Sequence, residues 1–90
     1  MKKKKHSPAK KIRRKVYLTF SASSTRDPIV CEMYDKFGVR FNIRSASVSE
    51  KVGLLALELE GEEKKIVQAF AYLKKRGVKV EPIEMDILEP

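Results

Sequence analysis

The chain has 90 residues, with 20 Lys or Arg, 12 Asp or Glu, one His and one Cys. This length predicts a single domain, and one cysteine excludes an intrachain disulfide or a thiolate metal cluster. No apolar run approaches the ~18 residues of a membrane-spanning helix, and no apolar segment follows the basic N-terminus as in a secretory signal, so we expect a cytoplasmic protein without a metal or cofactor.

The positive charge is concentrated at one end of the chain. Residues 1–15 carry nine of the 20 basic residues and no acid, so the other residues carry eleven basic and twelve acidic side chains and a net charge of −1. We predict a disordered basic tail over residues 1–14, a folded domain over 15–84 and a C-terminal tail over 85–90. The tail cations that could hold a nucleic acid or an anionic membrane surface are Lys2, Lys3, Lys4, Lys5, Lys10, Lys11, Arg13 and Arg14.

The first predicted element is a strand, because Val16, Leu18 and Phe20 alternate with Tyr17 and Thr19. A helix follows. Asp27 is expected to cap its N-terminus, Pro28 suits its first helical position, and Gly38 supplies its left-handed end.

A hairpin is expected next, over residues 39–48 and from about residue 52, because both segments alternate apolar and polar residues around a turn at 49–51. A second helix has acids in its first turn, an apolar stripe of Ile66, Ala69, Phe70 and Leu73, and Gly77 at its end. Val78 and Val80 begin a last strand, which Pro82 ends or places on an edge.

The element order is strand, helix, strand, strand, helix, strand. Right-handed crossovers turn this order into an α+β ferredoxin-like βαββαβ sandwich, a four-stranded antiparallel sheet with both helices on one face. The residues expected to face the helices are Leu18, Phe20, Phe41, Ile43, Leu55, Leu57 and Leu59.

The alternation leaves the other sheet face open. It is expected to carry Tyr17, Thr19, Arg40, Asn42, Arg44, Leu54, Ala56, Glu58, Lys79 and Glu81. Such a face could bind a small polar ligand, pair with a second subunit, or simply be solvated.

Two other functions are not favoured. The only His lies in the tail, and no Ser or Cys has an evident base partner, so we do not expect an enzyme or catalytic residues. The element order also fits an RNA-recognition motif, which stacks bases on aromatic residues of its first and third strands. The third strand here has no aromatic residue and no Lys or Arg, and the domain is near neutral, so RNA binding by the sheet is not expected.

The order and spacing of several short segments resemble those of the NIL domain family. They are residues 16–20, 27–30, 37–39, 42–43, 53–61 and 71–81, and together they cover about residues 15–84. The resemblance implies a ferredoxin-like, ACT-like regulatory domain. The family is best known as the C-terminal regulatory domain of methionine ABC-transporter ATPases, where it pairs in a dimer and binds methionine.

The resemblance also indicates a ligand site. The family is named for an Asn-Ile-Leu sequence on the second strand, which here reads Asn42-Ile43-Arg44, with a cation in place of an apolar residue. The amide of the Asn can donate to a ligand carboxylate and accept from an ammonium group. The predicted ligand-binding residues are Asn42, Arg40, Arg44 and Tyr17, with Leu54 and Ala56 at an apolar edge.

Three functional hypotheses follow. The first is a stand-alone, dimeric NIL domain that senses a small amino acid such as methionine in sulfur metabolism and signals to a separate effector protein. The second is a protein-interaction module without a ligand, which docks through an edge strand or the open face. The third is binding of nucleic acid or a membrane surface by the tail.

Overall fold

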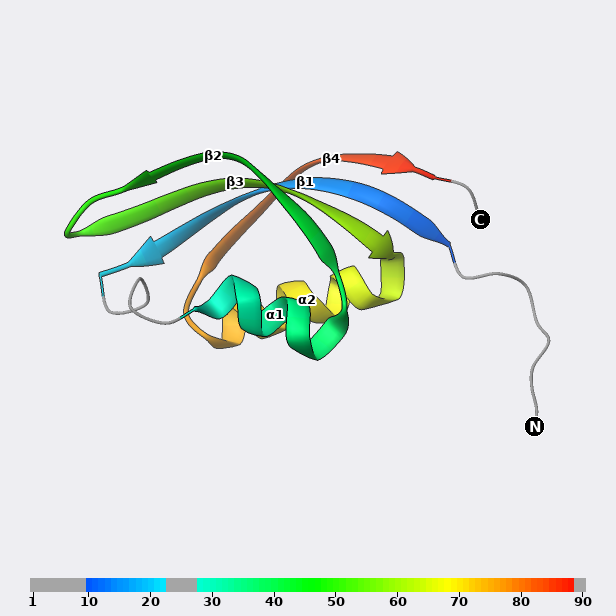
Figure 1. Ribbon diagram of the computed structural model, residues 1–90, viewed down its shortest axis with the longest axis horizontal. Coiled ribbons are helices and arrows are strands. Elements are labelled where there is room, and N and C mark those ends of the chain that lie inside the picture. Colours follow the sequence, from blue (N-terminus) through cyan, green and yellow to red (C-terminus); the bar gives the residue numbers. More distant parts are fainter. Residues whose placement is uncertain (1–9, 23–27, 89–90) are drawn as a thin grey trace.

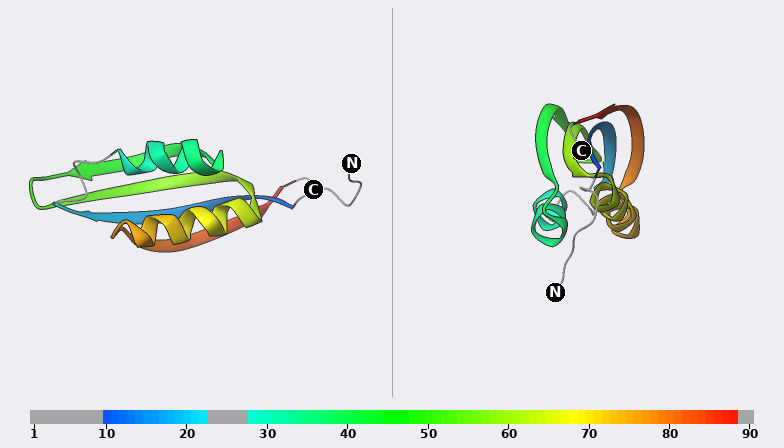
Figure 2. Two further views of the ribbon diagram at one scale, coloured as in Figure 1. Left: turned by 90° about the horizontal axis from the view of Figure 1, so that it is seen from below. Right: turned by 90° about the vertical axis from the view of Figure 1, so that its right-hand side faces the viewer.

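The computed structural model describes residues 10–22 and 28–88. The elements are β1 (Lys11–Ser21), α1 (Ile29–Phe37), β2 (Arg40–Val48), β3 (Val52–Glu62), α2 (Glu63–Lys75) and β4 (Lys79–Ile87). The strands form one antiparallel sheet in the order β2-β3-β1-β4, and both helices cover the same face of it (Figures 1 and 2). The predicted α+β ferredoxin-like sandwich is confirmed.

The core lies between the sheet and the two helices. The central strands supply alternate side chains to it, as a half-buried sheet requires, and each helix supplies one apolar stripe. Its residues are Ile12, Val16, Leu18, Phe20, Ile29, Met33, Val39, Leu57, Leu59, Ile66, Ala69, Leu73 and Val78.

The sheet extends further at both ends of the chain than the sequence predicts. β1 begins at Lys11 and pairs with β3 as far as Glu62, so residues 11–14 belong to the strand and not to a disordered tail. Burial of Ile12 explains this extension, because its side chain is only 2% exposed. β4 runs to Ile87, so residues 85–87 are also strand, while residues 1–9 lie outside the described part of the chain.

The ends of the helices agree with the prediction in part. Gly38 adopts a left-handed conformation (φ 67°) after α1, and Gly77 (φ 86°) follows α2. Pro28, however, occupies the N-cap position rather than the first helical one, and the capping residue predicted before it lies outside the described residues.

A bulge in β2 changes which side chains face the helices. Ile43 is opposite Leu57 on β3, but Ser45 is opposite Ala56, so Arg44 is an extra residue. Ala46 and Val48 therefore share the helix-facing side with Phe41 and Ile43, whereas Ser45 and Ser47 turn to the open face.

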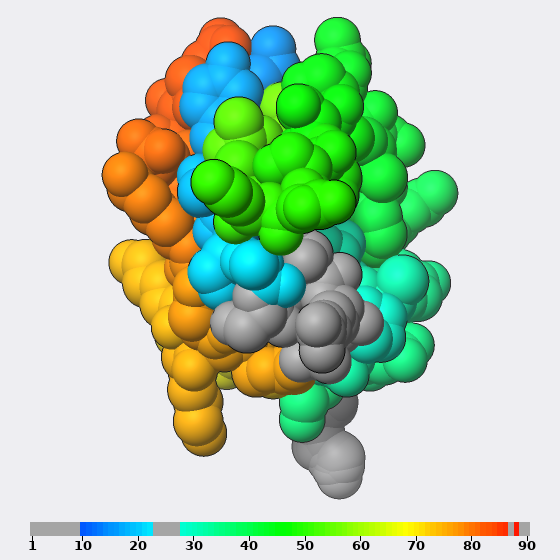
Figure 3. Space-filling view, turned by 90° about the vertical axis from the view of Figure 1, so that its left-hand side faces the viewer, coloured from blue at the N-terminus to red at the C-terminus, as the bar shows by residue number. Residues whose placement is uncertain are grey.

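The prediction that Ile43 packs in the core is wrong, because 57% of its surface is exposed. β2 is an edge strand, so no neighbouring strand covers its outer side. Phe41 and Leu55 are only partly buried against the core. The hairpin between β2 and β3 also extends beyond the helix layer (Figure 1), and Figure 3 looks onto this end, where the hairpin is green.

Candidate functional site

One half of the open face carries a network of oppositely charged side chains, which we call the charged region. Arg40 and Asn42 on β2 lie opposite Glu60 and Glu58 on β3. Arg13 on β1 lies 3.4 Å from Glu60. Further ion pairs join Lys15 to Glu84 at 3.3 Å and Arg44 to Glu58 at 3.9 Å.

A small pocket of about 160 Å³ opens in the charged region. Its lining is Arg40, Phe41, Asn42, Glu58 and Glu60. Two carboxylates beside the one cation compete with any anionic ligand. The arrangement therefore disfavours the recognition of a ligand carboxylate by Arg40 and Asn42.

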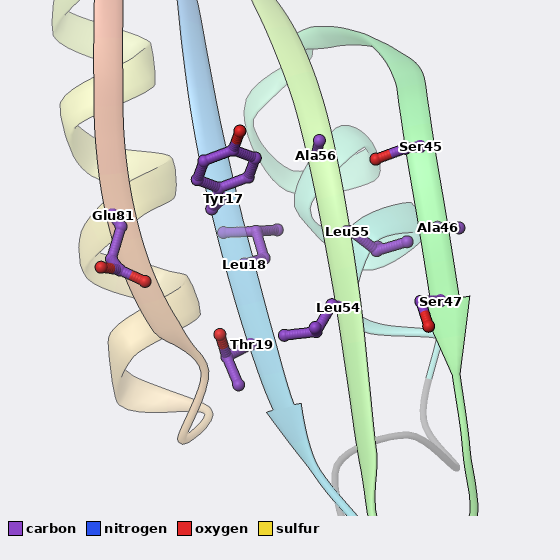
Figure 4. Close-up of a pocket in the computed structure, with 10 residues that line it drawn as sticks. All are labelled: Tyr17, Leu18, Thr19, Ser45, Ala46, Ser47, Leu54, Leu55, Ala56 and Glu81. Carbon is purple, nitrogen blue, oxygen red and sulfur yellow. The ribbon is translucent and has the colours of Figure 1, made fainter.

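The other half of the open face contains a larger pocket of about 440 Å³, which we call the hydroxyl pocket (Figure 4). Hydroxyl groups come from two strands, and the floor between them is apolar. The lining is Tyr17, Leu18 and Thr19 of β1, Ser45, Ala46 and Ser47 of β2, Leu54, Leu55 and Ala56 of β3, and Glu81 of β4.

The sheet register explains how the hydroxyl pocket is assembled. Tyr17 lies between Ala56 on β3 and Glu81 on β4, and Thr19 lies opposite Leu54. Because opposite residues of antiparallel strands point to the same face, these side chains converge on one surface. Tyr17 is 53% exposed and Leu54 is 47% exposed, so both are available to a ligand.

The family of the domain that carries these two pockets follows from its similarity to known proteins. The family model of the NIL domain matches residues 14–82. The chain belongs to the NIL domain family. The family resemblance predicted from the sequence is thereby confirmed.

The curated relatives of this NIL domain are much longer proteins. It is 37% identical over 70 residues to the methionine import ATP-binding protein MetN of Burkholderia thailandensis, which covers 73% of this chain and 20% of the relative. It is 36% identical over 73 residues to a protein of the same name from Desulfitobacterium hafniense. That match covers 77% of this chain and 22% of the relative. The chain thus spans about a fifth of the length of these relatives.

Solved structures show the same fold. The C-terminal domain of an ABC transporter ATP-binding protein from Enterococcus faecalis is 27% identical, with a TM-score of 0.69 over 78% of this chain and 82% of that one. A functionally unknown protein from Pediococcus pentosaceus is similar in fold alone, at 13% identity and a TM-score of 0.52, covering 91% of this chain and 97% of that one.

The predicted ligand residues of the NIL domain fall into two groups. Tyr17, Leu54 and Ala56 line the hydroxyl pocket, whereas Arg40 and Asn42 line the small charged pocket. Arg44 lines neither of these two pockets and pairs with Glu58.

Sequence reasoning missed part of the lining of the hydroxyl pocket. Ser45 and Ser47 were not predicted because strict alternation places them on the helix-facing side. A signal was present: the apolar positions of this strand change from odd numbers (39, 41, 43) to even numbers (46, 48), which indicates an inserted residue. Thr19 and Glu81 were placed on the open face, but not in the site.

Only some of the cations that were predicted to bind a nucleic acid or an anionic surface lie within the described residues. Lys10 pairs with Glu63 at 3.5 Å and Arg13 with Glu60 at 3.4 Å, so two of these cations form half-exposed ion pairs with acids of the folded domain. Arg14 lies opposite Leu59, with a buried Nε that has no hydrogen-bond partner, and Lys11 is exposed. The cations at positions 2–5 lie outside the described residues.

A polar cluster joins the two helices. Tyr72 Oη donates a hydrogen bond to Glu32 Oε1 at 2.8 Å, and Arg76 Nη1 donates to both Glu32 and Tyr72. Hydrogen bonds from Arg76 and then Tyr72 lower the pKa of Glu32, while burial, followed by the bond to Glu32, raises the pKa of Tyr72. These contacts connect α1 to α2.

Within residues 10–22 and 28–88, no group of three or more His, Cys, Asp or Glu side chains is arranged to hold a metal ion. None of the helices in the described part of the chain is long and apolar enough to cross a membrane.

Proposed function

We propose that this NIL domain is a regulatory module that binds a small amino acid with an apolar side chain, methionine first, in the hydroxyl pocket. The observation that carries the proposal is the composition of this pocket, which combines an apolar floor, several hydroxyl groups and a single carboxylate. The names of the curated relatives, methionine import ATP-binding proteins, support methionine as the first ligand to test.

Each part of an amino acid has a counterpart in this pocket. The carboxylate of Glu81 suits the ligand ammonium group. The hydroxyls of Tyr17, Thr19, Ser45 and Ser47 can donate to the ligand carboxylate. Leu54 and Ala56 offer apolar surface to a thioether or aliphatic chain.

Binding at this position would link all four strands, because each of them contributes to the pocket lining. A ligand that bridges the strands favours one sheet geometry over others. The regulatory output is the change that such a ligand makes in the affinity for an effector protein. We propose no catalytic step.

Isothermal titration calorimetry of the full chain with methionine tests the proposal. Glu81→Gln is expected to weaken binding about tenfold, because a charge-assisted hydrogen bond becomes a neutral one. Ala56→Leu is expected to fill the floor and abolish binding. A methionine analogue that lacks the ammonium group should bind the wild-type protein more weakly than methionine binds the Glu81→Gln variant, because it loses the whole hydrogen bond to position 81 and not only its charge.

Asn42→Ala is the control that separates the two pockets of the open face. Under the proposal it leaves methionine affinity unchanged. Absence of any binding heat at millimolar methionine would reject the proposal, and loss of binding in Asn42→Ala with normal binding in Glu81→Gln would move the site to the charged region.

A further inference from the structure

At the end of the molecule where β1 begins (Figure 1), a pocket of about 270 Å³ lies between the end of α1 and the start of α2. We call it the cationic pocket. Its charged lining is Lys11 of β1, Arg40 of β2, Glu60 and Glu62 of β3, and Lys65 of α2. The fold thus brings three exposed cations from three separate elements to one place.

These three cations have no acidic partner of their own. In the part of the chain that the structure describes, none of them forms an ion pair. Of the two acids, Glu60 already pairs with Arg13 at 3.4 Å. Three cations and one uncompensated carboxylate, that of Glu62, leave a surplus of about two positive charges. The small pocket of the charged region differs, because there two carboxylates face Arg40 alone.

The first turn of α2 adds to this positive charge. Its N-cap residue Glu62 and its third residue Lys65 both line the pocket, and no side chain caps the helix. The free N–H groups and the dipole of a helix start favour an anion. The end of α1, which also borders the pocket, has the opposite partial charge, and Lys36 in its last turn offsets it.

We propose that the cationic pocket binds a small phosphorylated molecule through Lys11, Arg40 and Lys65. A phosphate group carries up to two negative charges and three free oxygens, which matches the surplus charge and the number of cations. A carboxylate has one charge and two oxygens, so it would leave one cation without a contact. The half-buried ring of Phe37 also lines the pocket and offers apolar surface to a small organic group on the phosphate.

A chemical-shift titration of the labelled full chain with pyrophosphate, without methionine, tests this site independently of the methionine proposal. Ionic strength is held constant, because exposed charges respond to salt. The expected result is a saturable set of amide changes at residues 11, 37–40 and 60–65, which line or adjoin the pocket. Changes confined to residues 1–9, or equal changes at every Lys, would mean that pyrophosphate only follows the positive charge of the chain, and would overturn the proposal.

Lys65→Gln is expected to weaken pyrophosphate binding about fivefold, as the loss of one exposed ion pair does. Lys64→Gln is the matched control, because Lys64 is an exposed residue of the same helical turn that does not line the pocket. It changes the net charge equally and should bind like the wild type. Equal weakening in both variants would overturn the proposal, and circular dichroism verifies that each variant is folded.

Glu62→Gln is expected to act in the opposite direction and to tighten binding about threefold, because it removes the uncompensated carboxylate of the pocket. Glu50→Gln, an exposed acid in the turn between β2 and β3, is its control and should leave the affinity unchanged. A Glu62→Gln variant that binds no more tightly than Glu50→Gln contradicts the proposal.

Vesicles of phosphatidylglycerol distinguish a soluble phosphate compound from a lipid headgroup. Under the proposal, Lys65→Gln and Lys64→Gln co-sediment with these vesicles to the same extent. If vesicle binding depends on Lys65 and pyrophosphate changes no shift at the pocket, the cations serve a membrane surface and the proposal is overturned.

Discussion

Glu32 accepts hydrogen bonds from both Tyr72 and Arg76 and so connects the two helices. Because these donors favour the charged form, the pKa of Glu32 in the folded protein lies below its ordinary value of 4.5. The ionised carboxylate therefore stabilises the fold fully above about pH 4.5, and this stabilisation is lost as the pH falls through the lower, folded-state pKa.

The Glu32→Gln variant tests this role of the carboxylate. It is expected to be less stable than the wild type at neutral pH, and the difference in unfolding free energy should shrink as the pH falls below about 4.5. Urea unfolding at a series of pH values measures it. Asp35→Asn, an exposed acid on the same helix, is the control. A difference that stays constant with pH would show that the charge of Glu32 does not matter.

Single residues also determine how much of the site can be found from sequence. Tyr17, Leu54 and Ala56 follow from simple alternation, because the pairing of β1 with β3 has no irregularity. Ser45 and Ser47 do not, because the extra residue Arg44 reverses the alternation beyond it. Alternation within one strand does not reveal that Arg40 and Asn42 lie opposite acids, because this depends on the register between β2 and β3.

At the scale of elements, the end of α1 depends on one backbone conformation. Gly38 has φ 67°, and its N–H donates to the carbonyl of Tyr34 at 2.7 Å. An added Cβ would meet no atom within 4 Å, so space is not the constraint. The constraint is the left-handed conformation, which costs a residue such as alanine about 1–2 kcal/mol.

Gly38→Ala is expected to lower the unfolding free energy by about 1 kcal/mol, which corresponds to a fall in Tm of about 4–8 °C for a domain of this size. Gly61→Ala is the matched control, because that position has no positive φ and its nearest atom is the Cα of Val39 at 4.0 Å. Thermal unfolding of both variants measures the difference. Equal melting temperatures would mean that the left-handed position carries no strain.

The elements themselves were predictable where their pattern was long and regular. Both helices have a clear apolar stripe and a glycine at or near the end, and the central strands alternate without interruption. The start of β1 was not predictable in this way, because residues 13–15 are all charged. Arg13 and Lys15 pair with acids across the open face, so the strand continues through a basic segment whose composition is typical of a disordered tail.

At the scale of the whole molecule, charge and fold are separate properties. The net charge of +8 comes from residues 1–15, and the rest of the chain is near neutral. In the described residues the charges of the open face are largely compensated within one half of it. The other half contains the hydroxyl pocket, whose lining has hydroxyl and apolar side chains and Glu81 as its single charged group, and the proposed ligand site lies there.

The most direct test of this account is a map of amide chemical shifts during titration of the labelled protein with methionine. The account predicts that the largest changes occur at residues 17–19, 45–47, 54–56 and 81, which line the hydroxyl pocket. Changes centred on Arg40, Asn42 and Glu58, or no changes at millimolar methionine, would contradict it.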